Sequence, residues 1–111
     1  NRGGLAAVTR LLVDEALAPA CRREREELKA MLRGRVEVFN TLARPAGLTY
    51  PRYEGGFFVT LFADEAPARA AAMRAEGVFV VPQKGALRVA LCSVPERDIP
   101  RLVESLARHG R

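Results

Sequence analysis

Apolar residues repeat along this chain at helical spacing near both ends and at strand spacing in between. Over residues 4–18 the repeat predicts an amphipathic helix that ends near Pro19, because proline breaks the helical hydrogen-bond ladder. Its apolar face is formed by Leu5, Val8, Leu12 and Ala16. A second, longer helix is predicted from residue 20 to residue 43, and the proline and glycine within residues 44–47 end it. Its apolar stripe is formed by Leu28, Leu32, Val36, Phe39 and Ala43.

The period changes after residue 47, where three β-rich segments are predicted at residues 56–62, 78–82 and 87–93. A helix over residues 65–76 separates the first two, with Asp64 as its N-cap and Gly77 as its stop. A final helix is predicted between a cap at Asp98 and a stop at Gly110. The order ααβαββα predicts an α+β fold, with a small three-stranded sheet covered by helices in one domain.

Length, composition and cysteine spacing limit the classes of function that the chain could have. The chain has 111 residues, of which 49% are hydrophobic and 28% charged, and no apolar run approaches the roughly 20 residues of a membrane helix. Cys21 and Cys92 have no CxxC spacing and no companion histidines, so neither a metal site nor a disulfide framework is predicted, and a cytoplasmic location is expected. The start at Asn1, without signal-peptide features, suggests a fragment.

Arg88 is the residue that most needs an explanation, because it interrupts an otherwise apolar strand pattern. Alternation puts Leu87, Val89 and Leu91 on the core face of that strand and places Arg88 on the other face beside small residues. A guanidinium removed from water needs an anion, and its planar fork of donors suits a carboxylate best. The alternative is that Arg88 lies at a sheet edge and reaches water or pairs with an acid such as Glu54.

Two glycines followed by two phenylalanines mark a second feature, at the start of the first strand. Gly55 and Gly56 predict a tight turn or a close approach of the backbone to another group. Phe57 and Phe58 should point to opposite faces, so one of them is expected in the core and the other could line a pocket.

These segments together resemble a known family. The end of the long helix (residues 36–40), the stretch from Tyr50 to Phe58 and the stretch from Arg88 to Ser93 are similar, in order and spacing, to the class I/II (fold type I) pyridoxal-phosphate-dependent aminotransferases. The resemblance is to the C-terminal small domain of the aspartate and aromatic amino-acid members. It implies that Arg88 grips the substrate α-carboxylate and that Phe58, the second aromatic after the glycines, lines the site.

The resemblance also implies what this segment should lack. In these enzymes a larger domain holds the cofactor through a Schiff-base lysine, an aspartate and a phosphate cup. Lys29 falls on the charged helix and Lys84 in a hairpin turn, so neither is expected to be catalytic. Residues 1–111 are therefore expected to be a small domain that binds no pyridoxal phosphate and is inactive alone. His109 is expected to decorate a helix end.

Three functions follow, in order of preference. The first is the substrate-carboxylate-binding part of a homodimeric aminotransferase, which would transfer an amino group between an aromatic or dicarboxylic amino acid and a 2-oxo acid. The second is a free-standing carboxylate-binding module without catalysis. The third, a basic nucleic-acid-binding domain, is less favoured because the formal charge of +5 comes from arginines scattered among acids.

Overall fold

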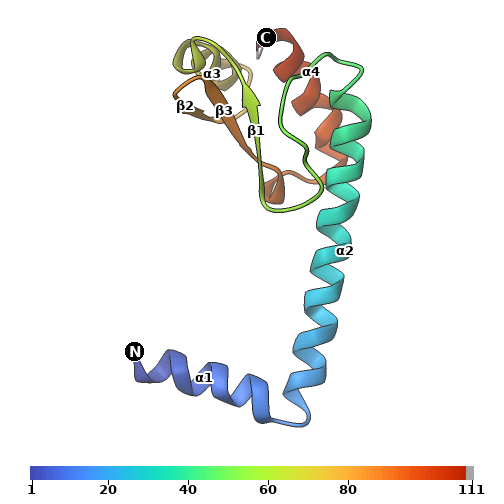
Figure 1. The fold of residues 1–111 in the computed structure, drawn as a ribbon, viewed down its shortest axis with the longest axis vertical. Helices are drawn as coiled ribbons and strands as arrows, with labels where there is room; N and C mark the ends of the chain where they lie inside the picture. The colour runs from blue at the N-terminus through green and yellow to red at the C-terminus, as the bar shows by residue number, and fades with distance from the viewer. Residues whose placement is uncertain (110–111) are drawn as a thin grey trace. The chain divides into compact units, whose positions relative to one another are not determined.

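Four α-helices and a three-stranded antiparallel sheet make up the computed structural model, which describes residues 1–109 (Figure 1). The order along the chain is α1 (Arg2–Val13), α2 (Leu17–Ala43), β1 (Phe58–Phe62), α3 (Ala66–Ala75), β2 (Val81–Gln83), β3 (Ala86–Ala90) and α4 (Ile99–His109). Two short 3₁₀ turns, Leu91–Ser93 and Glu96–Asp98, connect β3 to α4. The predicted α+β class and the order ααβαββα are both confirmed.

Two units divide the chain, the first being Asn1–Met31 and the second beginning at Leu32. The first unit holds α1 and the N-terminal part of α2, and no residue of α1 is buried. The buried residues of α2 are Val36, Phe39 and Ala43, all in the second unit. The apolar stripe predicted along α2 is therefore buried at its C-terminal end, whereas Leu28 is exposed.

The break between the first two helices was predicted at the wrong residue. The first helix ends at Val13, and Pro19 lies in the first turn of α2, where a missing N–H costs nothing. Asp14 makes the break: its Oδ1 accepts hydrogen bonds from the backbone N–H groups of Ala16 and Leu17, each at 2.9 Å. An aspartate that caps the following helix in this way stabilises the corner.

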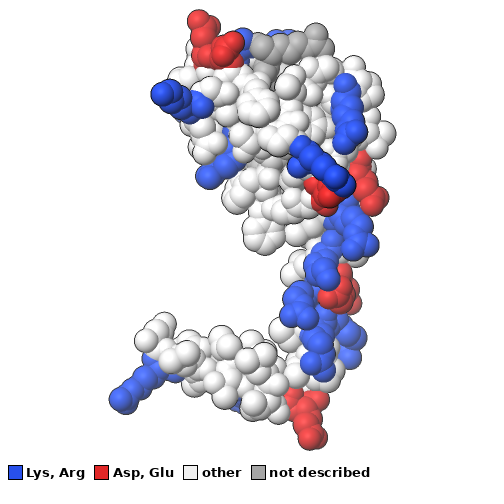
Figure 2. Space-filling model, in the orientation of Figure 1, with Lys and Arg blue, Asp and Glu red and all other residues white. Residues whose placement is uncertain are grey.

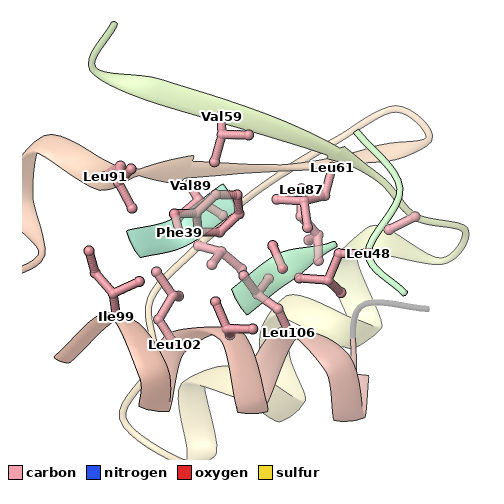
Figure 3. Packing of buried hydrophobic residues seen from close by; sticks show 14 of the residues in the cluster. Phe39, Leu48, Val59, Leu61, Leu87, Val89, Leu91, Ile99, Leu102 and Leu106 are labelled. Atoms are coloured by element: carbon pink, nitrogen blue, oxygen red, sulfur yellow. The ribbon is translucent and has the colours of Figure 1, made fainter. Parts of the chain in front are cut away.

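The sheet has the order β1-β3-β2, so the strand that carries Arg88 is central. Its inner face packs on α4, α3 and the end of α2 (Figure 3). The core includes Phe39, Val59, Leu61, Leu87, Val89, Leu91, Ile99, Leu102 and Leu106, all at most 5% exposed. The predicted core face of the last strand, with Leu87, Val89 and Leu91, is confirmed.

The strands are shorter than predicted because the chain turns at their ends. The last strand stops at Ala90, where Leu91–Ser93 tightens into a 3₁₀ turn, although Cys92 still donates its backbone N–H to the Phe57 carbonyl at 3.1 Å. The first strand starts at Phe58 rather than at residue 56, because Gly56 has a positive φ of 97°. The predicted second strand, 78–82, is observed at Val81–Gln83.

Helix termini in the second unit follow the predicted chemistry in part. The N-cap of α3 is Glu65, in a left-handed conformation without a side-chain cap, so the prediction of Asp64 is wrong by one residue. Gly77 ends the turn after α3 as predicted, with φ 78° and an N–H donated to the Arg74 carbonyl at 3.0 Å. Asp98 directly precedes α4 as the last residue of a 3₁₀ turn. The predicted stop at Gly110 lies outside the described residues.

Candidate carboxylate-binding site

The outer face of the sheet carries the candidate site. Residues paired directly across an antiparallel sheet share a face. The register pairs Arg88 with Thr60 on one side and with Val81 on the other, and pairs Phe58 with Ala90 and Phe62 with Ala86. Of the residues that the three strands place on this face, Arg88 alone is charged. The site is thus one guanidinium in an aromatic and aliphatic surface.

Arg88 is partly buried on the central strand, and its guanidinium has no acceptor among residues 1–109. Its Nε is buried and has no hydrogen-bond partner, and no ion pair joins Arg88 to an acid within residues 1–109. Glu54, the acid considered as its partner, instead pairs with Arg52. Two parts of the alternative interpretation are therefore wrong, because Arg88 is not on an edge strand and does not pair with Glu54.

Other arginines of the second unit show what a structural arginine looks like in this fold. Arg35 donates to the Cys92 carbonyl at 2.5 Å, Arg101 to the Glu76 carbonyl at 2.7 Å and Arg108 to the Glu76 carboxylate at 2.8 Å. Each of these guanidinium groups ties two segments together. Because Arg88 has no such contact, its donors remain available to a ligand.

Phe58 lies against Arg88. The guanidinium carbon of Arg88 is 4.8 Å from the centroid of the Phe58 ring, within the range of a cation–π contact. Phe58 and Phe57 are 47% and 59% exposed, so the prediction that one of them is a core residue is wrong. Val59 is the first core residue of β1 instead, at 1% exposed, because the strand begins at Phe58, two residues later than predicted, and Phe57 precedes it.

A hydrogen-bonded network in the second unit holds the loop that leads to Phe58. Asn40 on α2 donates from Nδ2 to the Tyr53 carbonyl at 2.8 Å and accepts from the Tyr50 hydroxyl at 2.9 Å. The Tyr53 hydroxyl donates to the Gly56 carbonyl at 2.8 Å. The Phe39 ring lies 5.5 Å from that of Tyr50 and 6.3 Å from that of Tyr53. The network fixes the glycine turn from which β1 begins.

Burial, with a smaller effect of nearby Cys92, raises the pKa of Tyr53. The Tyr53 hydroxyl therefore stays protonated and serves as a donor to Gly56. The sequence alone assigns no role to Tyr50, Tyr53 or Asn40. The signal for Asn40 in the sequence was an amide next to Phe39 in the apolar stripe of the long helix. The partners of Asn40 could not be predicted, because tertiary structure brings them to it.

The two lysines of the chain lie on α2 and in a turn of the sheet. Lys29 pairs with Glu26 on α2 at 2.8 Å, and Lys84 lies in the turn between β2 and β3, outside the strand positions that share a face with Arg88. Within residues 1–109 no group of His, Cys, Asp and Glu could hold a metal ion, and no helix is long and apolar enough to cross a membrane.

The fold is an α+β domain that is similar to part of several solved aminotransferases. An aminotransferase from Anaerococcus prevotii DSM 20548 is similar over 90% of this chain, with 34% sequence identity and a TM-score of 0.83. A Thermus thermophilus aspartate aminotransferase mutant is similar in fold over 92% of the chain, at 22% identity and a TM-score of 0.71. A Pyrococcus horikoshii kynurenine aminotransferase matches 90% of it, at 18% identity and a TM-score of 0.70.

The resemblance inferred from the sequence is confirmed: the chain is similar to solved aminotransferases, an aspartate and a kynurenine aminotransferase among them, over at least 90% of its length. It spans 25% of the length of the Anaerococcus protein and 28% of each of the other two. Comparison with protein-family models and with curated proteins gave no match.

Proposed function

We propose that residues 1–111 form the substrate-carboxylate-binding small domain of a pyridoxal-phosphate-dependent aminotransferase. The parent protein would move an amino group between an aromatic or dicarboxylic amino acid and a 2-oxo acid. The observation that carries the proposal is Arg88, an arginine on a central strand whose guanidinium has no hydrogen-bond acceptor and no acid bound to it within residues 1–109. Similarity to aminotransferases supports the class of the parent enzyme.

In this proposal the residues of the chain bind and orient the substrate. The two η nitrogens of Arg88 donate parallel hydrogen bonds to the α-carboxylate, which fixes the amino or oxo carbon relative to the rest of the enzyme. Phe58 flanks the bound group. The cofactor, when bound by the other domain, supplies the electron sink for the transfer. The chain alone would be inactive, and the intact enzyme would be a cytoplasmic homodimer.

Carboxylate binding by the chain tests the proposal. A calorimetric titration with 3-phenylpropionate should show binding, and the ligand should shift the side-chain N–H signal of Arg88 in the unmodified chain. Arg88→Ala should abolish binding, and Arg88→Lys should restore only part of it, because an ammonium cannot reproduce the planar fork. Arg52→Ala, which removes an exposed arginine that pairs with Glu54, is the matched control and should bind as the unmodified chain does. Equal affinity in Arg88→Ala would refute the proposal.

A free-standing carboxylate-binding module is the second candidate, since the same unpartnered guanidinium would serve it equally well. The gene region upstream of the codon for Asn1 distinguishes the two. An open reading frame that encodes a Schiff-base lysine motif supports the enzyme, and a start codon at this point supports the module.

Nucleic-acid binding is not favoured by the distribution of charge. Figure 2 shows basic side chains along α2 with acidic ones beside them. In its first turns Arg22, Arg23 and Arg25 alternate with Glu24, Glu26 and Glu27, and Lys29 is paired with Glu26. Mixed charges of this kind do not form the continuous positive surface that phosphate backbones require.

A further inference from the structure

Phe58 contacts Arg88 from a diagonal position in the sheet. The residue directly opposite Arg88 on β1 is Thr60, and Phe58 is opposite Ala90. Diagonal neighbours are about 7–8 Å apart at Cα, a distance that an aromatic and a long side chain can span together. The small side chain of Ala90 leaves space for the Phe58 ring to lean toward the guanidinium, whose carbon is 4.8 Å from the ring centroid.

No other described interaction fixes the direction of this guanidinium. Arg88 Nε has no hydrogen-bond partner, and Glu54 is occupied by Arg52. An arginine held by acids would be oriented by them but would lose the donors that a ligand needs. A ring in cation–π contact with the guanidinium can orient it without using its donors.

We infer that Phe58 is a positioning residue that acts through Arg88. It holds the guanidinium plane of Arg88 so that the edge of the guanidinium, which carries the donors, faces the carboxylate. This inference rests on the proposed function, and it assigns Phe58 a task that differs from lining a pocket. A residue that only lines the pocket would contact the apolar part of a ligand. A positioning residue affects every carboxylate, including one with no apolar part to contact.

Acetate is the probe that separates these two tasks, because it has a carboxylate and only one methyl group. Binding of acetate and of 3-phenylpropionate to each variant is measured by isothermal titration calorimetry, and the Arg88 side-chain N–H signals report the site of binding where Arg88 is present. Phe58→Leu should weaken both ligands by about fivefold, the effect of losing one cation–π contact near the surface. Phe58→Tyr keeps the ring and should retain the affinity of the unmodified chain.

Phe62→Leu is the matched control, because Phe62 is an exposed phenylalanine on the same strand and the same face, opposite Ala86. It should leave acetate binding unchanged. In the unliganded chain the Arg88 N–H protons should also show an upfield ring-current shift that Phe58→Leu removes and Phe62→Leu retains. Thermal unfolding of each variant checks that the fold is unaltered.

The outcomes separate the inference from the proposed function. If Arg88→Ala abolishes acetate binding but Phe58→Leu leaves it unchanged, the positioning role is wrong and the carboxylate site stands. An equal loss in Phe58→Leu and Phe62→Leu also overturns the positioning role. If the unmodified chain binds neither ligand, or Arg88→Ala binds both normally, the proposed function fails and the inference fails with it.

Discussion

At the scale of single residues, Arg88 and Asn40 show how far the sequence can be interpreted. The period-2 alternation around Arg88 correctly predicted its core neighbours and its position on the other face, because side-chain alternation is a local property of a strand. Its contact with Phe58 depends on the pairing register of β1 with β3, which no local pattern specifies. The partners of Asn40 are 10 and 13 residues away and are brought to it by folding.

Asn40→Ala should destabilise the second unit. The change removes the donor to the Tyr53 carbonyl and the acceptor for the Tyr50 hydroxyl, leaving two partly buried groups without partners. Loss of such a pair costs about 1–3 kcal/mol, so the urea midpoint should fall without a change in slope. Gln83→Ala, at an exposed position on β2, is the control and should have little effect. An unchanged midpoint in Asn40→Ala would show that the network adds no stability.

At the scale of elements, the order and type of the helices and strands could be predicted from the sequence, whereas their first and last residues were predicted less well. The change from helical to alternating period identifies the sheet. Asp14 and Pro19 are both helix-ending residues, and Asp64 and Glu65 are adjacent acids, so the sequence does not decide which one ends or begins a helix. That choice was made by the backbone conformations that the packed structure allows.

Hydrogen bonds to Glu76, the residue that follows α3, link α3 to α4 and make the free energy of unfolding depend on pH. We call this group of contacts the clasp. The Glu76 carboxylate bonds His109 Nε2 at 2.8 Å, Arg108 at 2.8 Å and the Ser105 hydroxyl at 3.1 Å. The hydrogen bond with His109 lowers the pKa of Glu76. Desolvation opposes this effect, while Ser105 and the charge of Arg108 add to it. His109, expected to decorate a helix end, therefore also joins two helices.

Because the pKa of Glu76 is lower in the folded chain than its ordinary value of 4.5, the clasp contributes fully above that value. Its contribution should be lost as the pH falls from about 4.5 through the folded-state pKa of Glu76. Urea unfolding at a series of pH values should show this loss, and Glu76→Gln should reduce the slope in the same range. Glu104→Gln, at an exposed position on α4, should leave the slope nearly unchanged. Identical slopes for Glu76→Gln and the unmodified chain would contradict the clasp.

At the scale of the whole molecule, the chain exposes apolar surface that a larger protein could cover. Leu5 and Leu12 on α1 are 70% and 74% exposed, and α1 buries no residue. The chain spans only about a quarter of the length of the solved aminotransferases it matches. An exposed apolar helix face of this kind favours association with other copies.

We therefore expect the chain to self-associate at high concentration, with α1 as the contact. Sedimentation velocity over a range of concentrations should show species larger than the monomer. Replacing Leu5 and Leu12 together by glutamate should reduce them, whereas Thr9→Glu, on an exposed position of the same helix, should have a smaller effect. A strictly monomeric chain at every concentration, with α1 protected from hydrogen exchange, would contradict this expectation.

The central claim is that Arg88 binds the substrate α-carboxylate, and kinetics of the intact enzyme test it most directly. Arg88→Ala removes two charge-assisted hydrogen bonds of about 1.5–3 kcal/mol each, so kcat/KM for an amino acid should fall by about two to four orders of magnitude. Slow turnover of an amine without an α-carboxylate should be nearly unaffected, and folding should barely change. If Arg88→Ala unfolds the domain while activity per folded molecule is retained, Arg88 is a structural residue and the account is contradicted.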